Sequence, residues 1–278
     1  MKVLILGADG FIGRHLAFGL RAAGAEVIAA ARAPGRLAAM GFRVLAADLG
    51  DPATQDRAFW APHLAGGVHV VNCAGLLTGS EAAFRAVHLS APAAVAAARD
   101  GGQFLQVSSV GIEGVETPFA RHRRAAEAML AQLPDVTVLR PGLVLAETSY
   151  GGSSLMRAFA ALPFARPVVG AGDQPFNPIH AADLAAVVLE CLRAPPGLGP
   201  FEIGGPESLS QEALGALYRR WLGLRPVPVL PLPVGLARAL GRLGDALRLG
   251  PISATAVAQL QHGVQADPAA LLARIPTR

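Results

Sequence analysis

Short apolar runs alternate with amphipathic stretches through the first half of the chain. Each run has the length and the β-branched content of a buried strand, and a turn then leads into a stretch with helical periodicity. The predicted strands are Lys2–Leu6, Glu26–Arg32, Phe42–Leu49, Val68–Gly75, Gln103–Ser109 and Val136–Leu145. The predicted helices are Phe11–Ala23, Glu81–Asp100, which Pro92 should kink or interrupt, and Phe119–Leu133. This alternation predicts an α/β fold, with a doubly wound parallel sheet covered by helices on both faces.

The pattern changes after about residue 146, where glycine and proline become denser and helical stretches dominate. We expect residues 1–146 to form the domain that contains the sheet. Residues 147–278 are expected to form a smaller, mainly helical lobe on the substrate side, with segments that return to the core of the first domain. Pro226–Pro233 is predicted to be an extended connector within this lobe.

A leucine-rich helix is predicted within residues 232–249. Leucines share one of its faces and arginines lie elsewhere; they are Leu236, Leu240, Leu243 and Leu247, with Arg238, Arg242 and Arg248. Such a helix most often covers the core of its own lobe, and this is the interpretation we favour. The alternative is a peripheral docking surface for a membrane or a protein partner.

Composition places the chain among globular proteins. Of its 278 residues, 52% are hydrophobic and 16% are charged, so we expect a buried core rather than disorder. No charge-free apolar run approaches the roughly 18 residues of a transmembrane span, and no basic apolar leader precedes the first strand. Cys73 and Cys191 lie far apart without a CxxC motif, which argues against a metal site or a disulfide framework. We therefore expect a cytoplasmic location.

The net charge of +4 comes almost entirely from arginine, because Lys2 is the only lysine. The arginines are scattered, apart from one cluster at Arg121–Arg124 within a predicted helix. Arg121, His122 and Arg124 are expected on the solvent-exposed surface of that helix. Nucleic-acid binding needs a basic stripe with interleaved aromatic residues. The sequence has neither, so no nucleic-acid partner is expected.

The turn after the first strand carries glycines at positions 7, 10 and 13. In a strand–turn–helix unit these glycines permit a tight turn, let the backbone approach a diphosphate and let the helix pack closely on the strand. The N-terminus of the helix then directs free N–H groups and a partial positive charge towards the phosphates. This turn therefore predicts a dinucleotide site in a Rossmann-type domain.

Residues at the ends of the next strands indicate which dinucleotide is bound. An acidic residue usually ends the second strand and binds the ribose 2′-hydroxyl of NAD, but Arg32 stands there instead. Because a guanidinium can bind a 2′-phosphate with two hydrogen bonds, NADP is favoured, with NAD as the alternative. Asp48 is expected to accept a hydrogen bond from the adenine amino group, although a helix cap remains the alternative. The small residues of Asn72–Gly75 permit close passage beneath a ribose.

Together these motifs resemble the atypical and extended short-chain dehydrogenase/reductases of the NAD(P)-dependent epimerase/dehydratase type. The segments that carry the resemblance are Gly7–Gly13, Ala47–Leu49, Asn72–Gly75, Val107–Ser109, Leu139–Val144 and Pro178–Ala185. Phe201–Pro206, followed by Leu209–Ser210, is similar to the branch that contains the mitochondrial complex I accessory subunit.

The resemblance implies a Rossmann fold, bound NADP(H) or NAD, and a small-molecule substrate in a cleft. Oligomeric state is left open. At the positions that match the family, it assigns cofactor contacts to Gly7, Asp9, Gly10, Phe11, Ile12, Arg32, Asp48, Leu49, Cys73, Ala74, Gly75, Arg123 and Pro141.

The family's catalytic Ser/Thr, Tyr and Lys have no counterparts here. Phe119 stands at the tyrosine position, Arg123 at the lysine position, and Val110 at the hydroxyl position. Without an ionisable proton, Phe119 cannot perform the general acid step, whereas Arg123 is expected to contact the nicotinamide ribose or a phosphate. The catalytic residues are therefore unknown.

Possible substitutes are better explained by structural roles. Ser108 and Ser109 are expected to satisfy backbone groups at a strand end, and Asp183, after His180, to lie at the start of a helix. Two functions remain open. One is an oxidoreductase or epimerase-like enzyme with non-standard catalytic residues. The other is a non-catalytic dinucleotide-binding sensor or assembly protein.

Overall fold

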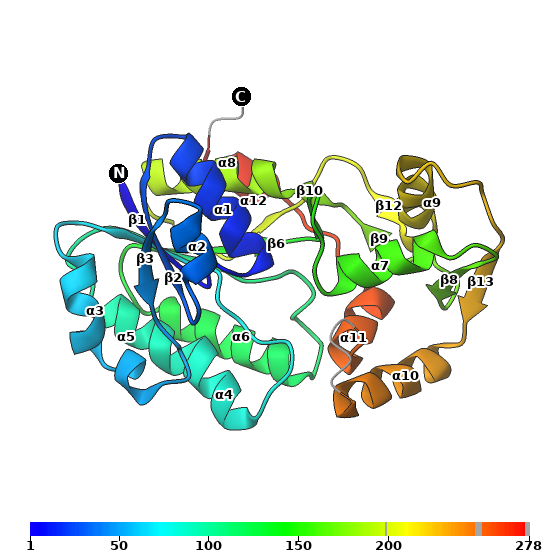
Figure 1. The fold of residues 1–278 in the computed structure, drawn as a ribbon, viewed down its shortest axis with the longest axis horizontal. Helices are drawn as coiled ribbons and strands as arrows, with labels where there is room; N and C mark the ends of the chain where they lie inside the picture. Colours follow the sequence, from blue (N-terminus) through cyan, green and yellow to red (C-terminus); the bar gives the residue numbers. More distant parts are fainter. Residues whose placement is uncertain (198, 248–251, 276–278) are drawn as a thin grey trace. The chain divides into compact units, whose positions relative to one another are not determined.

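The computed structural model describes residues 1–197, 199–247 and 252–275 (Figure 1). The chain divides into two compact units. The first consists of Met1–Pro141, His180–Ile203 and the segment from Asp267 onward, and the second of Gly142–Ile179 and Gly204–Ala266.

The first unit is built on a seven-stranded parallel sheet with the order β11-β6-β5-β4-β1-β2-β3. The strands are β1 (Lys2–Leu6), β2 (Glu26–Ala31), β3 (Arg43–Ala46), β4 (His69–Asn72), β5 (Phe104–Val107), β6 (Val136–Pro141) and β11 (Phe201–Ile203). Its central strands are buried along nearly their whole length because helices cover both faces. The predicted doubly wound Rossmann sheet is confirmed.

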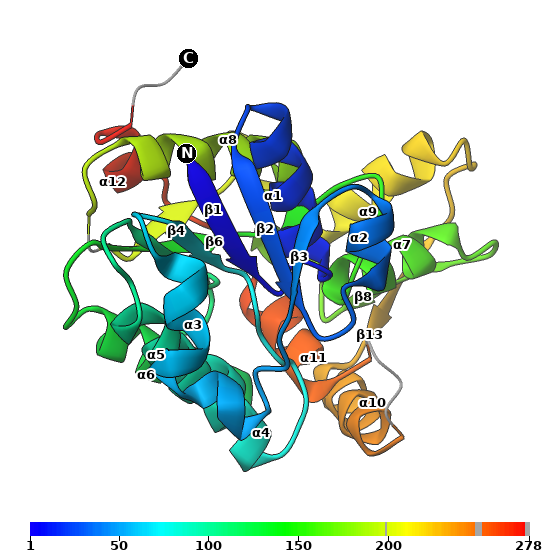
Figure 2. The same cartoon turned by 60° about the vertical axis from the view of Figure 1, so that its left-hand side comes forward.

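Helices pack on the two faces of this sheet (Figure 2). On one face lie α1 (Phe11–Ala22) and α8 (Ala181–Arg193), and on the other lie α3 (Arg57–Leu64), α5 (Ala91–Ala97) and α6 (Pro118–Leu130). Three short helices, α2 (Gly35–Ala39), α4 (Glu81–Arg85) and α12 (Ala269–Leu272), and the 3₁₀ turn Pro52–Gln55 complete the unit. A Cβ atom added to Gly19 of α1 would lie 2.6 Å from Cβ of Ala185 in α8, so these two helices are in close contact.

The helix predicted over Glu81–Asp100 is interrupted, as expected. It consists of α4, a single π-helical turn at Ala86–Ser90, and α5, which has Pro92 in its first turn. Proline lacks an N–H group and its ring clashes with the carbonyl four residues earlier, so the regular hydrogen-bond pattern cannot continue through this position. The widened turn places His88 in the interior of the unit.

The second unit contains four helices and several short strand pairs among its described residues. The helices are α7 (Gly152–Ala161), α9 (Gln211–Trp221), α10 (Val234–Ala246) and α11 (Ala254–His262). Strand β8 (Arg166–Val169) pairs with β13 (Val229–Leu232), and β9 (Pro175–Phe176) pairs with β12 (Leu209–Ser210). Two further short strands are β7 (Val144–Leu145) and β10 (Ile179–His180). The predicted connector at Pro226–Pro233 is extended, and four of its residues form β13.

The prediction that the leucines of α10 cover a core is wrong. Leu236, Leu240, Leu243 and Leu247 are 49%, 44%, 53% and 59% exposed. Ala237, Gly241 and Gly244 are buried instead, because the backbone around Ile252 and Ser253, before α11, passes too close for larger side chains. A Cβ atom on Gly244, for example, would lie 2.0 Å from the carbonyl oxygen of Ile252. The predicted arginine at position 248 lies outside the described residues.

No helix in the described part of the chain combines the length and the apolar character that crossing a membrane requires.

Candidate functional site

The turn between β1 and α1 requires glycine for two different reasons. Gly7 has a φ of +69°, and a Cβ atom there would lie 2.9 Å from Cα of Ala74. A Cβ atom on Gly13 would lie 2.2 Å from the carbonyl oxygen of Gly7, which accepts a 3.0 Å hydrogen bond from the N–H of Gly10. Helix α1 then begins at Phe11 without a side-chain cap. The first turn of α1 is thus open to an anionic ligand.

The predicted residues beyond β2 and β3 lie at the same edge of the sheet. Arg32 is exposed directly after β2. Asp48 follows β3, and its carboxylate accepts a 2.9 Å hydrogen bond from the N–H of Gly50. The helix cap considered for Asp48 is provided by Asp51, which caps the following 3₁₀ turn. Leu49 is buried, so it supports this edge of the sheet.

The chain passes closest to the glycine turn where β4 ends. The N–H of Cys73 donates to the carbonyl of Leu6 at 3.0 Å, and the side chain of Asn72 accepts from the N–H of Ala74 at 3.1 Å. Strand order reverses between β1 and β4, and doubly wound sheets bind ligands at this point. Pro141 ends β6 at the same carboxyl edge.

Arg123 of α6 lies beneath this edge and is only 8% exposed. Its guanidinium donates to the carbonyl of Val107 at 2.8 Å and to that of Ala74 at 3.4 Å, which fixes it between the ends of β5 and β4. A Cβ atom on Gly75 would lie 2.3 Å from Nη2 of Arg123, so the guanidinium occupies space that only glycine leaves free. Nε of Arg123 has no hydrogen-bond partner among the described residues.

Phe119 and His88 line the same region. Phe119, one turn before Arg123, is 6% exposed, and its ring centre lies 5.4 Å from the guanidinium carbon. His88 packs edge-on against Phe119 at 6.2 Å and accepts a 3.0 Å hydrogen bond from the N–H of Leu76 through Nε2. Sequence reasoning missed His88. The only indication in the sequence was Pro92, which predicted that the helix would be interrupted. It did not indicate that His88 would be directed into the interior.

The ionisable groups of this region are held in one protonation state near neutral pH. Burial, reinforced by the positive charge of Arg123, lowers the pKa of His88 to about 3. Burial raises the pKa of the Cys73 thiol to about 12 against the opposing effect of Arg123. Burial also lowers the pKa of Arg123 to about 10, which still leaves it charged. None of the three therefore exchanges a proton readily between pH 5 and pH 8.

The protonation of His88 predicts a pH-dependent stability. Its pKa falls from 6.5 to about 3 on folding, so the unfolded chain binds an extra proton between these values. The free energy of unfolding should fall by about 1.4 kcal/mol for each pH unit below pH 6.5. His88→Gln keeps an acceptor for Leu76 but does not titrate, so urea unfolding of this variant should lose that slope. Equal slopes for the variant and the wild type would contradict the assignment.

The expectation that His122 lies on the surface is wrong. It is 6% exposed, stacks on Phe84 with ring centres 5.3 Å apart, and contacts Glu81 at 3.1 Å through Nε2. Helix α4 packs against α6 and covers this side chain, an arrangement that the periodicity of α6 alone did not indicate. Arg121 is exposed as expected and pairs with Glu81 at 3.6 Å.

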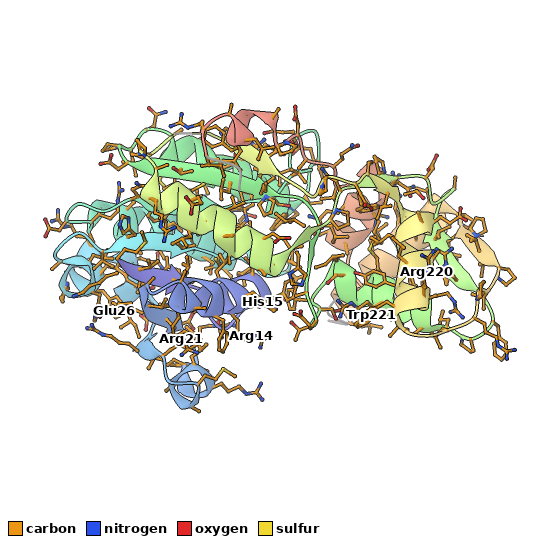
Figure 3. All side chains as sticks on the ribbon, turned by 90° about the horizontal axis from the view of Figure 1, so that it is seen from above. Arg14, His15, Arg21, Glu26, Arg220 and Trp221 are labelled. Carbon is orange, nitrogen blue, oxygen red and sulfur yellow. The ribbon has the colours of Figure 1, made fainter. Side chains whose placement is uncertain are left out.

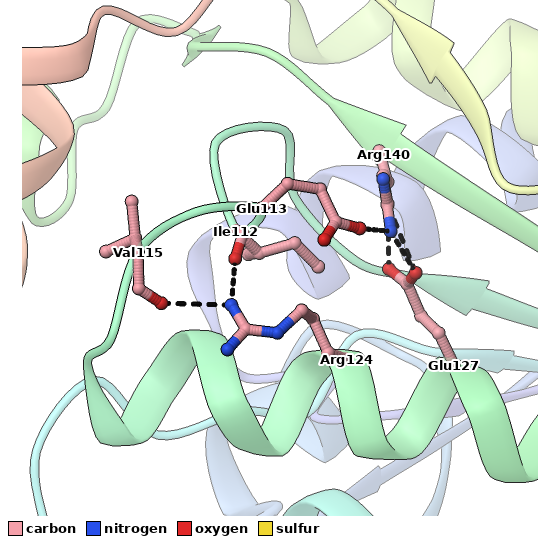
Figure 4. A network of polar contacts seen from close by, with 6 residues as sticks. All are labelled: Ile112, Glu113, Val115, Arg124, Glu127 and Arg140. Atoms are coloured by element: carbon pink, nitrogen blue, oxygen red, sulfur yellow. Dashed lines mark hydrogen bonds and ion pairs between the residues drawn. The ribbon is translucent and has the colours of Figure 1, made fainter.

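Arg124 also differs from the solvated residue expected. It is half-buried and donates hydrogen bonds to the carbonyls of Ile112 and Val115, as Figure 4 shows. Its other guanidinium nitrogen pairs with Glu116 at 2.8 Å. The residue therefore fixes the loop between β5 and α6.

Arg140 of β6 holds the same loop from the other side (Figure 4). Its guanidinium binds both oxygens of Glu127 on α6, with Nε distances of 3.0 and 3.1 Å and an Nη2 distance of 2.5 Å. Nη2 also donates to Glu113 in the loop at 2.6 Å. Burial opposes the charge of Arg140, but the bonds to Glu127 and Glu113 outweigh it and raise the arginine's pKa. Sequence reasoning missed this network.

Asp183 has the structural role expected of it, and His180 before it is also structural. His180 caps α8 by accepting a 3.2 Å hydrogen bond from the N–H of Ala182, and Asp183 lies in the first helical turn.

Comparisons with known proteins agree with this geometry. Residues 7–195 match the sequence model of a family described as NAD(P)H-binding. The chain is 28% identical over 267 residues to the mitochondrial NADH dehydrogenase (ubiquinone) 1 alpha subcomplex subunit 9 of Arabidopsis thaliana. That alignment covers 86% of this chain and 62% of the plant protein, so the chain spans about three fifths of the relative's length.

Solved structures with the same fold include sugar-nucleotide enzymes. A UDP-glucose 4-epimerase from Thermotoga maritima, with UDP-glucose, has a TM-score of 0.68 and 17% identity, covering 84% of this chain and 86% of that one. A UDP-glucuronic acid 4-epimerase from Bacillus cereus, in complex with NAD, has a TM-score of 0.68 and 16% identity, covering 94% and 98%. At these identities the likeness establishes the fold.

Proposed function

The chain belongs to the NAD(P)H-binding family, and from this premise we propose that it binds NADP(H) at the carboxyl edge of its parallel sheet and retains the dinucleotide without turning it over. The observation that carries the proposal is the set of side chains around Arg123. A charged guanidinium, a neutral imidazole and a neutral thiol lie there with pKa values far from neutrality, beside the phenyl ring of Phe119.

The residues present suit a dinucleotide. The diphosphate would lie against Gly7, Gly10 and the first turn of α1, where Gly7 leaves no room for a side chain and the helix begins without a side-chain cap. Asp9, Phe11 and Ile12 belong to the same turn. The unpartnered Nε of Arg123 is a buried donor that a ribose hydroxyl can satisfy. Cys73, Ala74 and Gly75 would pass beneath that ribose, with Pro141 at the neighbouring strand end.

The adenosine end of the ligand would lie at the ends of β2 and β3. Asp48 and Leu49 would border the adenine. The carboxylate of Asp48 already accepts from Gly50 through one oxygen, and a second hydrogen bond from the adenine amino group is compatible with its acceptor capacity.

The preference for NADP over NAD is attributed to Arg32. A guanidinium can hold the 2′-phosphate bidentately, and hydrogen bonds to charged groups contribute about 1.5–3 kcal/mol. Arg32→Glu is therefore expected to weaken NADPH binding by about tenfold to a hundredfold and to leave NADH binding equal or stronger. Isothermal titration with both nucleotides measures the ratio. Arg36→Glu, at an exposed position in the following helix, is the matched control. An unchanged ratio in Arg32→Glu, or an equal change in Arg36→Glu, would exclude Arg32 as the determinant.

A bound nicotinamide supplies hydride transfer, which in carbonyl chemistry needs a matched proton donor. The chain's own residues near Arg123 do not provide one, because an efficient general acid has a pKa close to the working pH. Phe119 has no exchangeable proton, and its buried ring lies 5.4 Å from the guanidinium carbon of Arg123. Arg123 would orient the ribose rather than transfer a proton. Loss of proton transfer costs about 10²–10⁴ in rate, whereas these contacts leave dinucleotide binding intact.

An oxidoreductase or epimerase-like activity on a small substrate is the second candidate. The observation in its favour is Ser108, whose buried hydroxyl has no partner among the described residues, contrary to the role expected for it. The hydroxyl of Ser109 does satisfy a backbone group, donating to the carbonyl of Val110 at 2.9 Å. A seryl hydroxyl can donate a hydrogen bond to a substrate carbonyl, but the reaction also needs a group that transfers a proton, and His88, with a pKa of about 3, is too weak a base to serve near neutral pH.

The plant relative is described as a subunit of a mitochondrial complex. We therefore extend the proposal to a structural role, in which the bound dinucleotide stabilises this chain within a protein assembly. The cytoplasmic location expected from the cysteines stays a prediction.

The nucleotide content of the purified protein tests the proposal. We expect NADP(H) to co-purify in a near-stoichiometric amount and the reduced form to remain reduced when carbonyl, quinone or sugar-nucleotide substrates are added. Nicotinamide fluorescence follows the redox state. Sustained oxidation with a bell-shaped pH profile would favour the second candidate, and protein that binds neither nucleotide would contradict both.

A further inference from the structure

The exposed leucine stripe of α10 has no counterpart to cover it among the described residues. Its four members follow a 4-3-4 spacing, which places them along one side of the helix. The buried side of α10 is formed by small residues and faces α11, as the two helices lie together in both Figure 1 and Figure 2. The leucines are therefore directed elsewhere.

The charge of α10 and of the chain before it is predominantly positive. Between Glu212 and Asp245 the chain contains five arginines and no acidic residue, whereas Asp245, near the end of α10, is exposed. Four of the arginines are exposed, namely Arg220, Arg225, Arg238 and Arg242. Arg238 and Arg242 lie on the side of α10 opposite the leucines.

Other large apolar side chains of the second unit are also exposed. Trp221, which follows Arg220 at the end of α9 (Figure 3), is 65% exposed and its ring centre lies 5.3 Å from the guanidinium carbon of Arg157, and Phe164 is 86% exposed. In α10 itself, leucines on one side and arginines on another are the pattern of helices that lie in a membrane–water interface.

We propose that the leucine stripe of α10 inserts into the surface of an anionic lipid bilayer, with Arg238 and Arg242 of the same helix contacting the lipid phosphates. These two exposed arginines outnumber Asp245 on α10 and so complement a negatively charged leaflet, to which each basic residue contributes about 1 kcal/mol. Insertion to the depth of the headgroups removes the leucines from water without requiring a spanning helix.

A second copy of the chain fits this stripe less well. The exposed fractions of the four leucines, 49%, 44%, 53% and 59%, amount to roughly two whole side chains. A stable protein interface buries about 800 Å² on each partner, which is more than twice the area of two leucine side chains. The spacing also continues for fewer than two full heptads, whereas a coiled coil usually needs three or four.

Vesicle sedimentation of the full-length protein tests the proposal. We expect binding to vesicles that contain phosphatidylglycerol, at least tenfold weaker binding to phosphatidylcholine alone, and further weakening with salt. Leu240→Glu/Leu243→Glu should lower binding at least tenfold, because glutamate removes insertion and adds repulsion. Arg238→Gln/Arg242→Gln should lower binding to the anionic vesicles by about fivefold for each arginine, the factor that corresponds to roughly 1 kcal/mol.

Leu272→Glu is the matched control. Leu272 is 44% exposed, the same as Leu240, but lies in the first unit. Circular dichroism and thermal unfolding verify that each variant folds. Anion-dependent binding that survives Leu272→Glu and is lost in Leu240→Glu/Leu243→Glu supports the proposal. Absence of vesicle binding overturns it, as does an equal loss in the control. If the wild type is a dimer that does not bind vesicles, and Leu240→Glu/Leu243→Glu is a monomer, the stripe is instead the contact with a second copy of the chain.

Discussion

Gly10→Ala is expected to weaken NADPH binding by about tenfold to a hundredfold while leaving the protein folded. Apart from the carbonyl oxygen of Gly7, at 3.1 Å, no atom lies within 4 Å of a Cβ atom added at this position, so the unliganded protein tolerates the methyl group with a small adjustment. The second glycine of the fingerprint, however, is the one that allows the backbone to approach a diphosphate. Overpacking a close contact costs about 1–3 kcal/mol, which corresponds to the stated loss of affinity.

Alanine substitutions at two other glycines serve as controls that distinguish an effect on NADPH binding from an effect on folding. Gly35→Ala adds a methyl group with no atom within 4 Å and should change neither affinity nor stability. Gly13→Ala brings a Cβ atom to 2.2 Å from the carbonyl oxygen of Gly7 and should lower the melting temperature. Isothermal titration and thermal unfolding of the three variants measure both quantities. If Gly10→Ala binds NADPH as the wild type does, the diphosphate does not lie against this turn.

Arg140→Met is expected to lower the free energy of unfolding by about 3–5 kcal/mol, because it leaves the carboxylate of Glu127 buried without its partner. Arg140 and Glu127 are 9% and 7% exposed, so water cannot replace the lost contacts. The loop that Arg140 holds through Glu113 leads into α6, which carries Phe119 and Arg123. NADPH affinity should therefore fall as well.

The double variant Arg140→Met/Glu127→Leu shows whether the loss of stability in Arg140→Met comes from the unpaired buried charge of Glu127 or from the loss of packing. Removing both charges should recover most of the stability, since replacing a buried ion pair with apolar residues is often neutral. Glu113→Gln, at an exposed carboxylate, should cost less than about 1 kcal/mol. Chemical denaturation of the wild type, Arg140→Met, Glu127→Leu and the double variant gives the coupling energy between the two residues. A double variant no more stable than Arg140→Met would show that the charge of Glu127 is not the cause.

The fold was predictable because its signals are local. Buried parallel strands are short apolar runs, and the glycine turn at Gly7–Gly13 has a strand before it and a helix after it, so the order of elements determined the sheet. The family match over residues 7–195 confirms that the chain belongs to an NAD(P)H-binding family. The order of the motifs along the chain also placed the predicted contacts at one edge of the sheet.

The surroundings of Arg123 were less predictable because they depend on contacts between distant segments. The periodicity of α6 placed His122 on the side away from Arg123, but α4 packs over that side and buries it. His88 is turned inward by a π-helical turn, whose position no sequence period marks. For α10 the hydrophobic pattern predicted the helix correctly but predicted the wrong side to be buried. The buried side consists of glycine and alanine, because these residues allow the segment before α11 to approach more closely than leucine would.

A crystal structure of the protein with NADPH tests the central claim most directly, through the identity of the groups within about 3.5 Å of a carbonyl oxygen placed at the hydride-donating carbon. We predict the diphosphate on the turn at Gly7 and Gly10, a hydrogen bond from Arg123 to the nicotinamide ribose, and Phe119 where a proton donor would stand. A tyrosine, carboxylic acid or histidine from either unit within that distance would contradict the account, as would a dinucleotide bound away from the glycine turn.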